Sequence, residues 1–197
     1  MAGHYFDPQP ASAERRGTVH LHLADLDLDL ATGTGVFAGH EVDRGTLVLL
    51  RHIPAPPTGD LLDLGCGYGP IAVTLAARSP DAKVWAVDVN ERALALAAEN
   101  AAAAGLENLT VARPDEIPAD TMFSAIYSNP PIRIGKPALH ELLTRWLGRL
   151  GADGRAWLVV QKHLGSDSLQ RWLEETGHPT TRVAADKGYR LLEVQQR

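Results

Sequence analysis

The sequence predicts an α/β fold: a doubly wound, mostly parallel sheet of seven strands with an N-terminal β-hairpin and helix as an extension. From residue 61 onward, short apolar segments alternate with longer segments of helical periodicity. A glycine-rich turn in LLDLGCGYGP, residues 61–70, joins the first of these strands to its helix. The last two strand-like segments have a short connection, which predicts an antiparallel pair at one edge of the sheet.

The N-terminal part predicts an extension packed on this core. Residues 1–17 are polar and read as an arm, whereas residues 19–32 alternate strictly between leucine or valine and polar side chains. That alternation predicts a β-hairpin with its turn near Ala24 and Asp25. After a loop at 35–40, residues 42–53 predict a helix with Asp43 near its start. We therefore expect one structural domain, in which residues 1–57 cover the core formed by residues 58–197.

The core segments have ordinary start and stop signals. Asn90 is a good N-cap, Gly105 stops the alanine-rich helix, and Pro137 suits the first turn of the next helix. The expected strands are 61–64, 82–87, 109–112, 122–128, 155–161, 182–186 and 189–195. The expected helices follow Gly69 and end before Pro80, then occupy 90–105, 137–150 and 168–177.

Composition limits the classes of function. The chain has 197 residues, enough for one well-packed domain, and no apolar run approaches the roughly 20 residues of a membrane span. Without a signal-peptide pattern, we expect a cytoplasmic protein. The single cysteine excludes an internal disulfide, and no C-x-x-C or histidine cluster has metal-site spacing, so no metal is expected. The net charge of −5 argues against broad, non-specific nucleic-acid binding.

The glycine turn is the strongest functional signal. Asp63, Gly65, Gly67 and Gly69 form the pattern D-x-G-x-G-x-G, and glycines at such a turn let the backbone approach a ligand closely. A dinucleotide fingerprint would place a third glycine at position 70, where the chain has Pro70. The turn alone is either a cofactor site or simply a tight strand-to-helix turn, and Pro70 disfavours NAD as the ligand.

An acidic residue ends the second strand of the core. Asp88 follows the apolar segment 82–87, and a carboxylate there can accept both hydroxyls of a ribose. Asn90 is the better cap for the following helix, which leaves Asp88 for a ligand. Asp88 supports an adenosine-containing ligand without choosing among such ligands.

A proline pair follows the fourth strand of the core. Asn129, Pro130, Pro131 and Ile132 make a corner with few amide donors, because proline has no N–H. Carbonyl groups and the Asn129 amide dominate this corner, which suits recognition of an NH2 group. Taken alone, the same residues could simply form a rigid turn.

These motifs together resemble a known family. The glycine turn resembles motif I of the class I S-adenosylmethionine (SAM) methyltransferases, and Asn-Pro-Pro resembles motif IV of enzymes that methylate exocyclic or amide nitrogen. Residues 35–50 and 4–12 resemble the small-domain methyltransferases, which include bacterial 16S rRNA guanine-N2 enzymes. The resemblance implies a Rossmann-like class I fold, with residues 58–197 as the methyltransferase domain of a single-domain member.

The resemblance also assigns cofactor residues. Glycine-turn residues would contact the methionine half of SAM, with Asp63 organising the loop and Asp88 holding the ribose. Asp115 would bind the adenine amino group, although it could equally be a polar turn residue. The implied cofactor set is Asp63, Gly65, Cys66, Gly67, Tyr68, Gly69, Asp88, Val89, Asp115 and Asn129.

For the reaction, the resemblance assigns Asn129, Pro130, Pro131 and Ile132 to catalysis. Family members usually have an aromatic residue where this chain has Ile132. Phe37 could supply the missing stacking surface or could be a core anchor, and Arg133 and Lys136 are further candidates for substrate binding.

The expected substrate is an exocyclic guanine amino group of RNA, most simply ribosomal RNA. A protein glutamine or a small-molecule amine is the alternative acceptor. A non-catalytic SAM-binding module is a third possibility, and the oligomeric state is left open.

Overall fold

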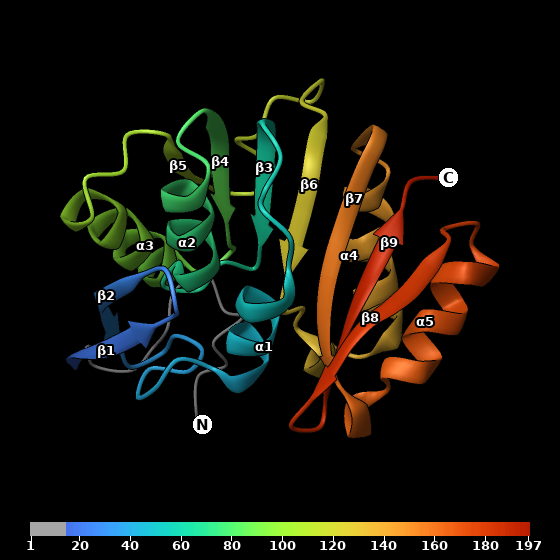
Figure 1. Ribbon diagram of the computed structural model, residues 1–197, viewed down its shortest axis with the longest axis horizontal. Coiled ribbons are helices and arrows are strands. Elements are labelled where there is room, and N and C mark those ends of the chain that lie inside the picture. The colour runs from blue at the N-terminus through green and yellow to red at the C-terminus, as the bar shows by residue number, and fades with distance from the viewer. Residues whose placement is uncertain (1–14) are drawn as a thin grey trace.

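The computed structural model describes residues 15–197, so most of the predicted arm lies outside the described residues. Its main sheet has seven strands in the order β5-β4-β3-β6-β7-β9-β8 (Figure 1). The strands are β3 (Gly59–Leu64), β4 (Ala82–Val87), β5 (Leu109–Ala112), β6 (Phe123–Ser128), β7 (Leu150–Gln161), β8 (Thr180–Asp186) and β9 (Tyr189–Gln195). Neighbours from β5 to β7 are parallel, and β9 runs antiparallel to both β7 and β8. The predicted sheet and its antiparallel end are confirmed.

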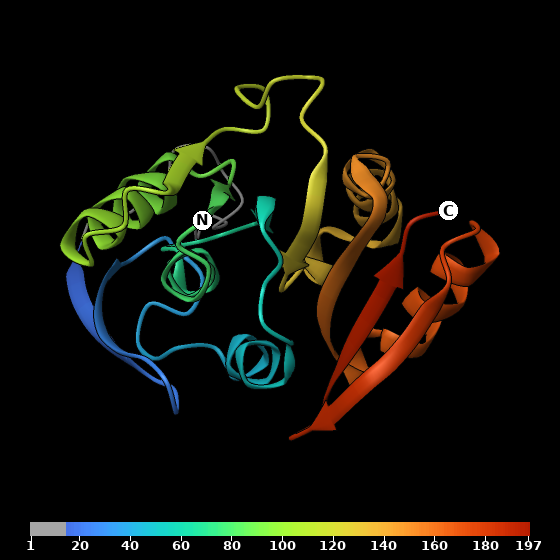
Figure 2. The same ribbon diagram turned by 45° about the horizontal axis from the view of Figure 1, so that its top comes forward.

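Helices cover both faces of this sheet (Figure 2). They are α1 (Arg44–His52), α2 (Pro70–Arg78), α3 (Glu91–Ala103), α4 (Lys136–Leu147) and α5 (Ser166–Glu175). Buried side chains of α1, α2 and α3 form one apolar cluster, and those of α4 and α5 form a second. Successive side chains of β3 point to opposite faces of the sheet, so this strand contributes to both clusters: Leu61 belongs to the first and Leu62 to the second.

The predicted hairpin is a separate two-stranded sheet, β1 (Arg16–His22) with β2 (Asp27–Gly33). Its turn closes where the sequence indicated, with Leu23 N donating to Leu26 O at 2.8 Å. Asn100 of α3 then holds the hairpin in place: its Oδ1 accepts from Ala31 N at 2.7 Å, and its Nδ2 donates to Ala31 O and to Tyr68 O. One buried amide thus joins the hairpin, α3 and the glycine turn.

The largest differences from the expected boundaries lie between α4 and β7. Helix α4 ends at Leu147, and β7 begins at Leu150 rather than at residue 155. A Cβ atom on Gly154 would lie 2.8 Å from Phe123 O, so the absence of a side chain lets the first part of β7 approach β6 closely. Within the described residues, the helices are too short or too polar to cross a membrane.

Candidate active site

Three of the predicted residues directly follow the ends of three adjacent parallel strands. Gly65 follows β3, Asp88 follows β4 and Asn129 follows β6. The register pairs Leu64 with Val87, so these strands end side by side. The carboxyl edge of a parallel sheet is where α/β proteins bind ligands, and topology alone therefore gathers these residues.

The glycine turn connects β3 to α2 and is fastened to the end of β4. Gly65 N and Cys66 N donate to Val87 O at 2.8 and 3.0 Å. Gly65, Gly67 and Gly69 all have left-handed backbones, with φ of 76°, 56° and 90°. A Cβ on Gly65 or Gly67 would meet nothing within 4 Å, whereas one on Gly69 would lie 3.1 Å from Ala97 Cβ. Two glycines therefore open toward a ligand, and the third allows α2 to pack against α3.

A cavity of about 560 Å³ lies above this edge, within the range of small-molecule sites. Residues from the glycine turn, the end of β4 and the proline corner line it together. The predicted site residues in its lining are Phe37, Gly65, Gly67, Asp88, Val89, Asn129, Pro130, Pro131, Ile132 and Arg133.

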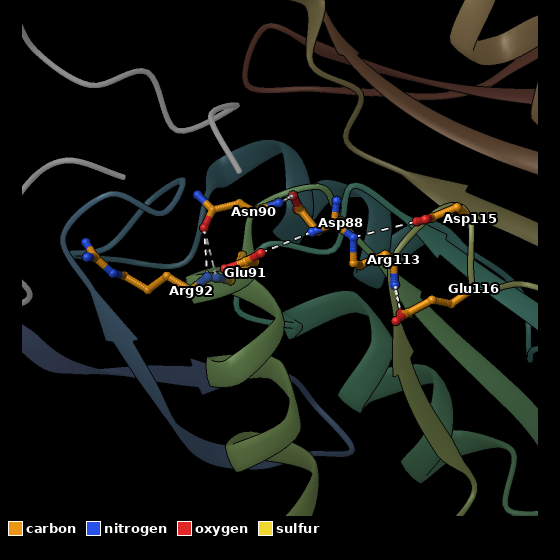
Figure 3. A network of polar contacts seen from close by, with 8 residues as sticks. Asp88, Asn90, Glu91, Arg92, Arg113, Asp115 and Glu116 are labelled. Atoms are coloured by element: carbon orange, nitrogen blue, oxygen red, sulfur yellow. Dashed lines mark hydrogen bonds and ion pairs between the residues drawn. The ribbon is translucent and has the colours of Figure 1, made fainter. Parts of the chain in front are cut away.

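Asp88 braces the glycine turn from inside this cavity. Its Oδ2 accepts from Gly67 N and its Oδ1 from Asn90 N, both at 2.9 Å. Asn90 is the N-cap of α3, as expected, since its side chain accepts from Arg92 N and Ala93 N (Figure 3). Burial raises the pKa of Asp88. Each carboxylate oxygen has a second lone pair, so Asp88 can still accept hydroxyl groups from a ligand.

Asp63 lies beneath the turn and is fully buried. Its Oδ2 accepts from Ala72 N at 2.9 Å, which links the strand to the first turn of α2. Its Oδ1 has no hydrogen-bond partner among residues 15–197. Burial raises the pKa of Asp63 to about 8.

Cys66, Tyr68 and Gly69 belong to the turn but are not part of the cavity lining. Cys66 and Tyr68 are buried, and burial raises the pKa of the Cys66 thiol. A thiol held protonated is a poor nucleophile, which agrees with the interpretation of Cys66 as a small buried residue. Lys136, the first residue of α4, is exposed and also absent from the lining.

Asp115 is not among the residues that line the cavity. Its side chain is 78% exposed and lies 3.6 Å from Arg113 Nε, and its neighbour Pro114 lines the cavity instead. Figure 3 shows the Asp115 carboxylate directed toward Arg113. Glu116 accepts from Arg113 N at 2.6 Å and closes the turn that carries Asp115 outward. The adenine-binding role of Asp115 stays a prediction, beside the alternative of a polar turn residue.

Asp43, expected from the sequence only at the start of a helix, orients Asn129. Asn129 Nδ2 donates to Asp43 Oδ1 at 2.7 Å and to Thr46 Oγ1 at 3.3 Å. The same Asp43 oxygen accepts from Thr46 N at 3.0 Å, as the N-cap of α1. A carboxylate only accepts, so the amide nitrogen of Asn129 must face it. The described residues donate no hydrogen bond to Asn129 Oδ1, which is left for a ligand.

The proline corner continues into a short turn of 3-10 helix, η1 (Ile132–Ile134). Pro130 O accepts from Ile132 N at 2.8 Å, and Pro131 O accepts from Ile134 N at 3.1 Å. One lone pair of the Pro130 carbonyl is therefore already used. Ile132 is partly buried against the second apolar cluster and presents its aliphatic side chain to the cavity.

Aromatic side chains reach the cavity from other elements. Phe37 lies in its lining and is 42% exposed, so it is not the core anchor considered above. Tyr189, the first residue of β9, also lines the cavity, and a Cβ on Gly45 would lie 2.7 Å from its ring. Trp146 of α4 is a third aromatic residue in the cavity lining. The sequence gives no local signal for Tyr189, because its position depends on β9 inserting between β7 and β8.

The residues present fit a nucleoside sulfonium cofactor. The cradle at Gly65 and Gly67 is open, Asp88 faces the cavity beside it, and the strand order is that of the class I methyltransferases. The fold is thus that of SAM-dependent methyltransferases. The family model "Methyltransferase small domain" matches residues 27–193. The chain therefore belongs to the methyltransferase small domain family, whose members are SAM-dependent enzymes.

Comparison with individual proteins agrees with this family. The chain is 34% identical to the uncharacterized protein YbxB of Bacillus subtilis, with 100% of both chains covered. It is 38% identical to ribosomal RNA small subunit methyltransferase C of Pseudomonas putida over 80% of this chain and 48% of that protein. The chain thus spans about half the length of these ribosomal RNA methyltransferases.

Solved structures share the fold. The 16S rRNA N2 methyltransferase RsmC of T. thermophilus, in complex with AdoMet and guanosine, has a TM-score of 0.75 at 21% identity, covering 95% of this chain and 52% of that one. A ribosomal protein L11 methylase of Lactobacillus delbrueckii has a TM-score of 0.64 at 21% identity, covering 82% and 81%.

Proposed function

We propose that this chain is a SAM-dependent N-methyltransferase that acts on an exocyclic guanine amino group of RNA, with ribosomal RNA as the substrate class. The observation that supports it most directly is Asn129, which lines the cavity: Asp43 holds its amide nitrogen, and its oxygen accepts no hydrogen bond from the described residues. An amide oxygen held in this way suits an NH2 donor. Ribosomal RNA methyltransferases among the relatives support the choice of acceptor. We also propose a cytoplasmic location.

Gly65, Gly67 and Asp88 would hold the cofactor, which when bound supplies an electrophilic methyl group on a sulfonium. The left-handed glycines present bare backbone, and Asp88 presents oxygens that can accept ribose hydroxyls. Val89, 40% exposed and next to Asp88, would give apolar contact to the nucleoside. These residues would bind the donor without taking part in the transfer.

Asn129 and Pro130 would orient the acceptor nitrogen. Asn129 Oδ1 can accept one hydrogen of an amino group, and the remaining lone pair of Pro130 O can accept the other. Two such bonds direct the nitrogen lone pair toward the cofactor side and stabilise positive charge as it develops on nitrogen. A guanine amino nitrogen is a weak nucleophile because its lone pair is delocalised into the ring, so orientation matters more than a strong base.

The surrounding side chains suit a flat, apolar acceptor. Ile132, Phe37 and Tyr189 would contact a base that has left its stack, with the aromatic rings taking the place of the residue usual at position 132. Arg133 and Arg145 line the same cavity and offer positive charge to a phosphate backbone. Because the whole chain has a net charge of −5, we expect RNA binding to depend on these local cations.

The acceptor class is tested by transfer of a labelled methyl group. Full-length protein and tritiated SAM are incubated with 16S ribosomal RNA, transfer RNA, free guanosine and a release-factor protein. Label on N2 of a guanine in ribosomal RNA is the expected result. Label on protein glutamine or on a small amine would show that RNA is not the acceptor, while the chain would still be a methyltransferase.

Asp88→Ala should weaken SAM binding by about 1–3 kcal/mol, because bonds to the ribose are lost and the turn loses the brace at Gly67. Asn129→Ala should retain SAM binding and abolish turnover. Calorimetry measures the first effect and the methyl-transfer assay measures the second. If Asn129→Ala lost SAM binding as well as turnover, Asn129 would be a structural residue, and the proposed role would be contradicted.

A further inference from the structure

The outer face of the N-terminal hairpin brings together imidazole and carboxylate groups that the proposed reaction does not use. β1 contributes His20 and His22, and the register places them opposite Asp29 and Asp27 of β2. All four side chains point away from the core because their apolar neighbours occupy the inner face. The sequence shows no histidine cluster with metal-site spacing, since the third ligand comes from the paired strand.

The distances within this group suit a small divalent ion. His20 Nε2 lies 2.7 Å from Asp27 Oδ1, and His22 Nδ1 lies 3.6 Å from Asp27 Oδ2. Two ligands about 2.0–2.1 Å from a tetrahedral zinc ion are about 3.3 Å apart, and the observed separations lie on either side of that value. Among residues 15–197, His20, His22 and Asp27 are the one group of three such side chains whose ligand atoms lie within 4.8 Å of one another.

Asp29 occupies the position of an outer-shell partner. His20 Nδ1 lies 2.8 Å from Asp29 Oδ1 and His20 Nε2 lies 2.7 Å from Asp27 Oδ1, so without a metal both ring nitrogens donate to a carboxylate. A bound metal would displace the proton from Nε2, while Asp29 would keep accepting from Nδ1. Metal-binding histidines commonly donate their second ring nitrogen to a carboxylate in this manner.

We propose that His20, His22 and Asp27 bind one transition-metal ion of the Zn²⁺ type on the hairpin, with water completing the tetrahedron and Asp29 orienting His20. Two imidazoles and one carboxylate are ligands that zinc accepts. Asp27 lies five positions after His22 and seven after His20, on the other side of the turn, so the ion would tie β1 to β2. The ion would have a structural role, because these residues are not part of the cavity lining.

The test uses untagged full-length protein freed of metal, because a histidine tag would bind the same ions. Titration with ZnCl₂ by calorimetry should show saturable one-to-one binding, and CoCl₂ should produce the visible absorption of tetrahedral cobalt. Zinc should also raise the thermal unfolding temperature, since a ligand that binds only the native state stabilises it.

Variants distinguish the ligands from their surroundings. His20→Ala/His22→Ala should lose zinc binding, and Asp29→Asn should weaken it about 10- to 100-fold. His52→Ala is the matched control: His52 is also exposed, belongs to no such group within the described residues, and should leave binding unchanged. All variants should unfold like the wild type without metal and should bind SAM equally well.

Two results would overturn the proposal. One is the lack of saturable zinc binding by the wild type at millimolar metal. The other is equal affinity in the wild type and in the double-histidine variant, which would place the ion elsewhere.

Discussion

At the scale of single residues, the feature most relevant to catalysis is the pairing of Asn129 with Asp43. Asp43 Oδ1 accepts from the backbone N–H of Thr46, in the first turn of its helix, and from the side-chain amide of Asn129. One carboxylate oxygen thus caps α1 and sets which end of Asn129 faces the cavity. Asp43 is a positioning residue, because it acts through Asn129.

Asp43→Ser should lower kcat by about 10- to 100-fold and change the affinity for SAM little. Serine still caps the helix, so the stability of α1 should be nearly unchanged. Its shorter side chain no longer reaches Asn129, whose amide can then rotate. Steady-state kinetics and chemical denaturation measure the two effects on the same protein.

Asp43→Asn is the matched control for that prediction. One asparagine oxygen can accept from both Thr46 N and Asn129 Nδ2, so turnover should be close to that of the wild type. Equal loss of kcat in both variants would indicate that the charge of Asp43 matters, and not the orientation that it imposes.

At the scale of elements, the glycine turn shows that one motif can serve two purposes. Gly65 and Gly67 leave space for a ligand, and Gly69 leaves space for Ala97 of a neighbouring helix. Asn100 adds a further connection, since its buried amide reaches both Tyr68 O in the turn and Ala31 in the hairpin. The hairpin and α3 therefore support the loop that would hold the cofactor.

Gly67→Ala should reduce SAM affinity about tenfold or more, because the new methyl group enters the cavity. The same change should cost about 1–2 kcal/mol of folding free energy, since alanine disfavours the left-handed backbone at φ 56°. Calorimetry with SAM and denaturant unfolding measure the two quantities.

Gly105→Ala separates the two effects. Gly105 has φ of 67° and, like Gly67, open space at its Cβ position, but it lies beyond α3 and outside the cavity lining. We expect a similar loss of stability with unchanged SAM affinity. If both variants lost SAM affinity to the same extent, backbone strain alone would explain the effect of Gly67→Ala.

At the scale of the whole molecule, the buried Asp63 couples stability to pH. Its pKa is about 8 in the fold, against 3.8 for the unperturbed group, because burial penalises the charged form. Between these values the native state keeps a proton that the unfolded state releases. The contribution of Asp63 to stability is therefore complete below the lower pKa and is lost as the pH rises through the folded pKa.

Asp63→Asn should flatten this dependence. The variant has no proton to lose, and its side-chain oxygen can still accept from Ala72 N. From about pH 4 to pH 8 the stability of the wild type relative to the variant should fall by up to about 1.4 kcal/mol per pH unit. Denaturation curves across that range give the difference, in which shifts common to both proteins cancel. Parallel curves would mean that Asp63 ionises normally.

The strands, helices and caps were largely predictable because short-range geometry determines them. Alternating leucines predicted the hairpin. Asn90 was predictable as the N-cap of α3, because its short side chain can accept a hydrogen bond from a backbone N–H in the first turn of the helix. The start of β7 was missed because Gly151 and Gly154 disfavour a strand locally, although the close approach of β7 to β6 requires the glycine at position 154. The expectation for Asp115 followed from its place after the third strand, and the turn beyond that strand carries its side chain outward instead.

The sequence by itself determined the succession of strands and helices, the glycine turn, and the residues that end each parallel strand, because these depend on neighbours a few positions apart. Only the tertiary structure decided that Asp43 meets Asn129, that Tyr189 enters the cavity and that Asp27 faces two histidines. Asp43 and Asn129 are separated by 86 positions, and no local preference encodes their contact. Such contacts arise when helices and strands pack together, since packing balances the whole core at once.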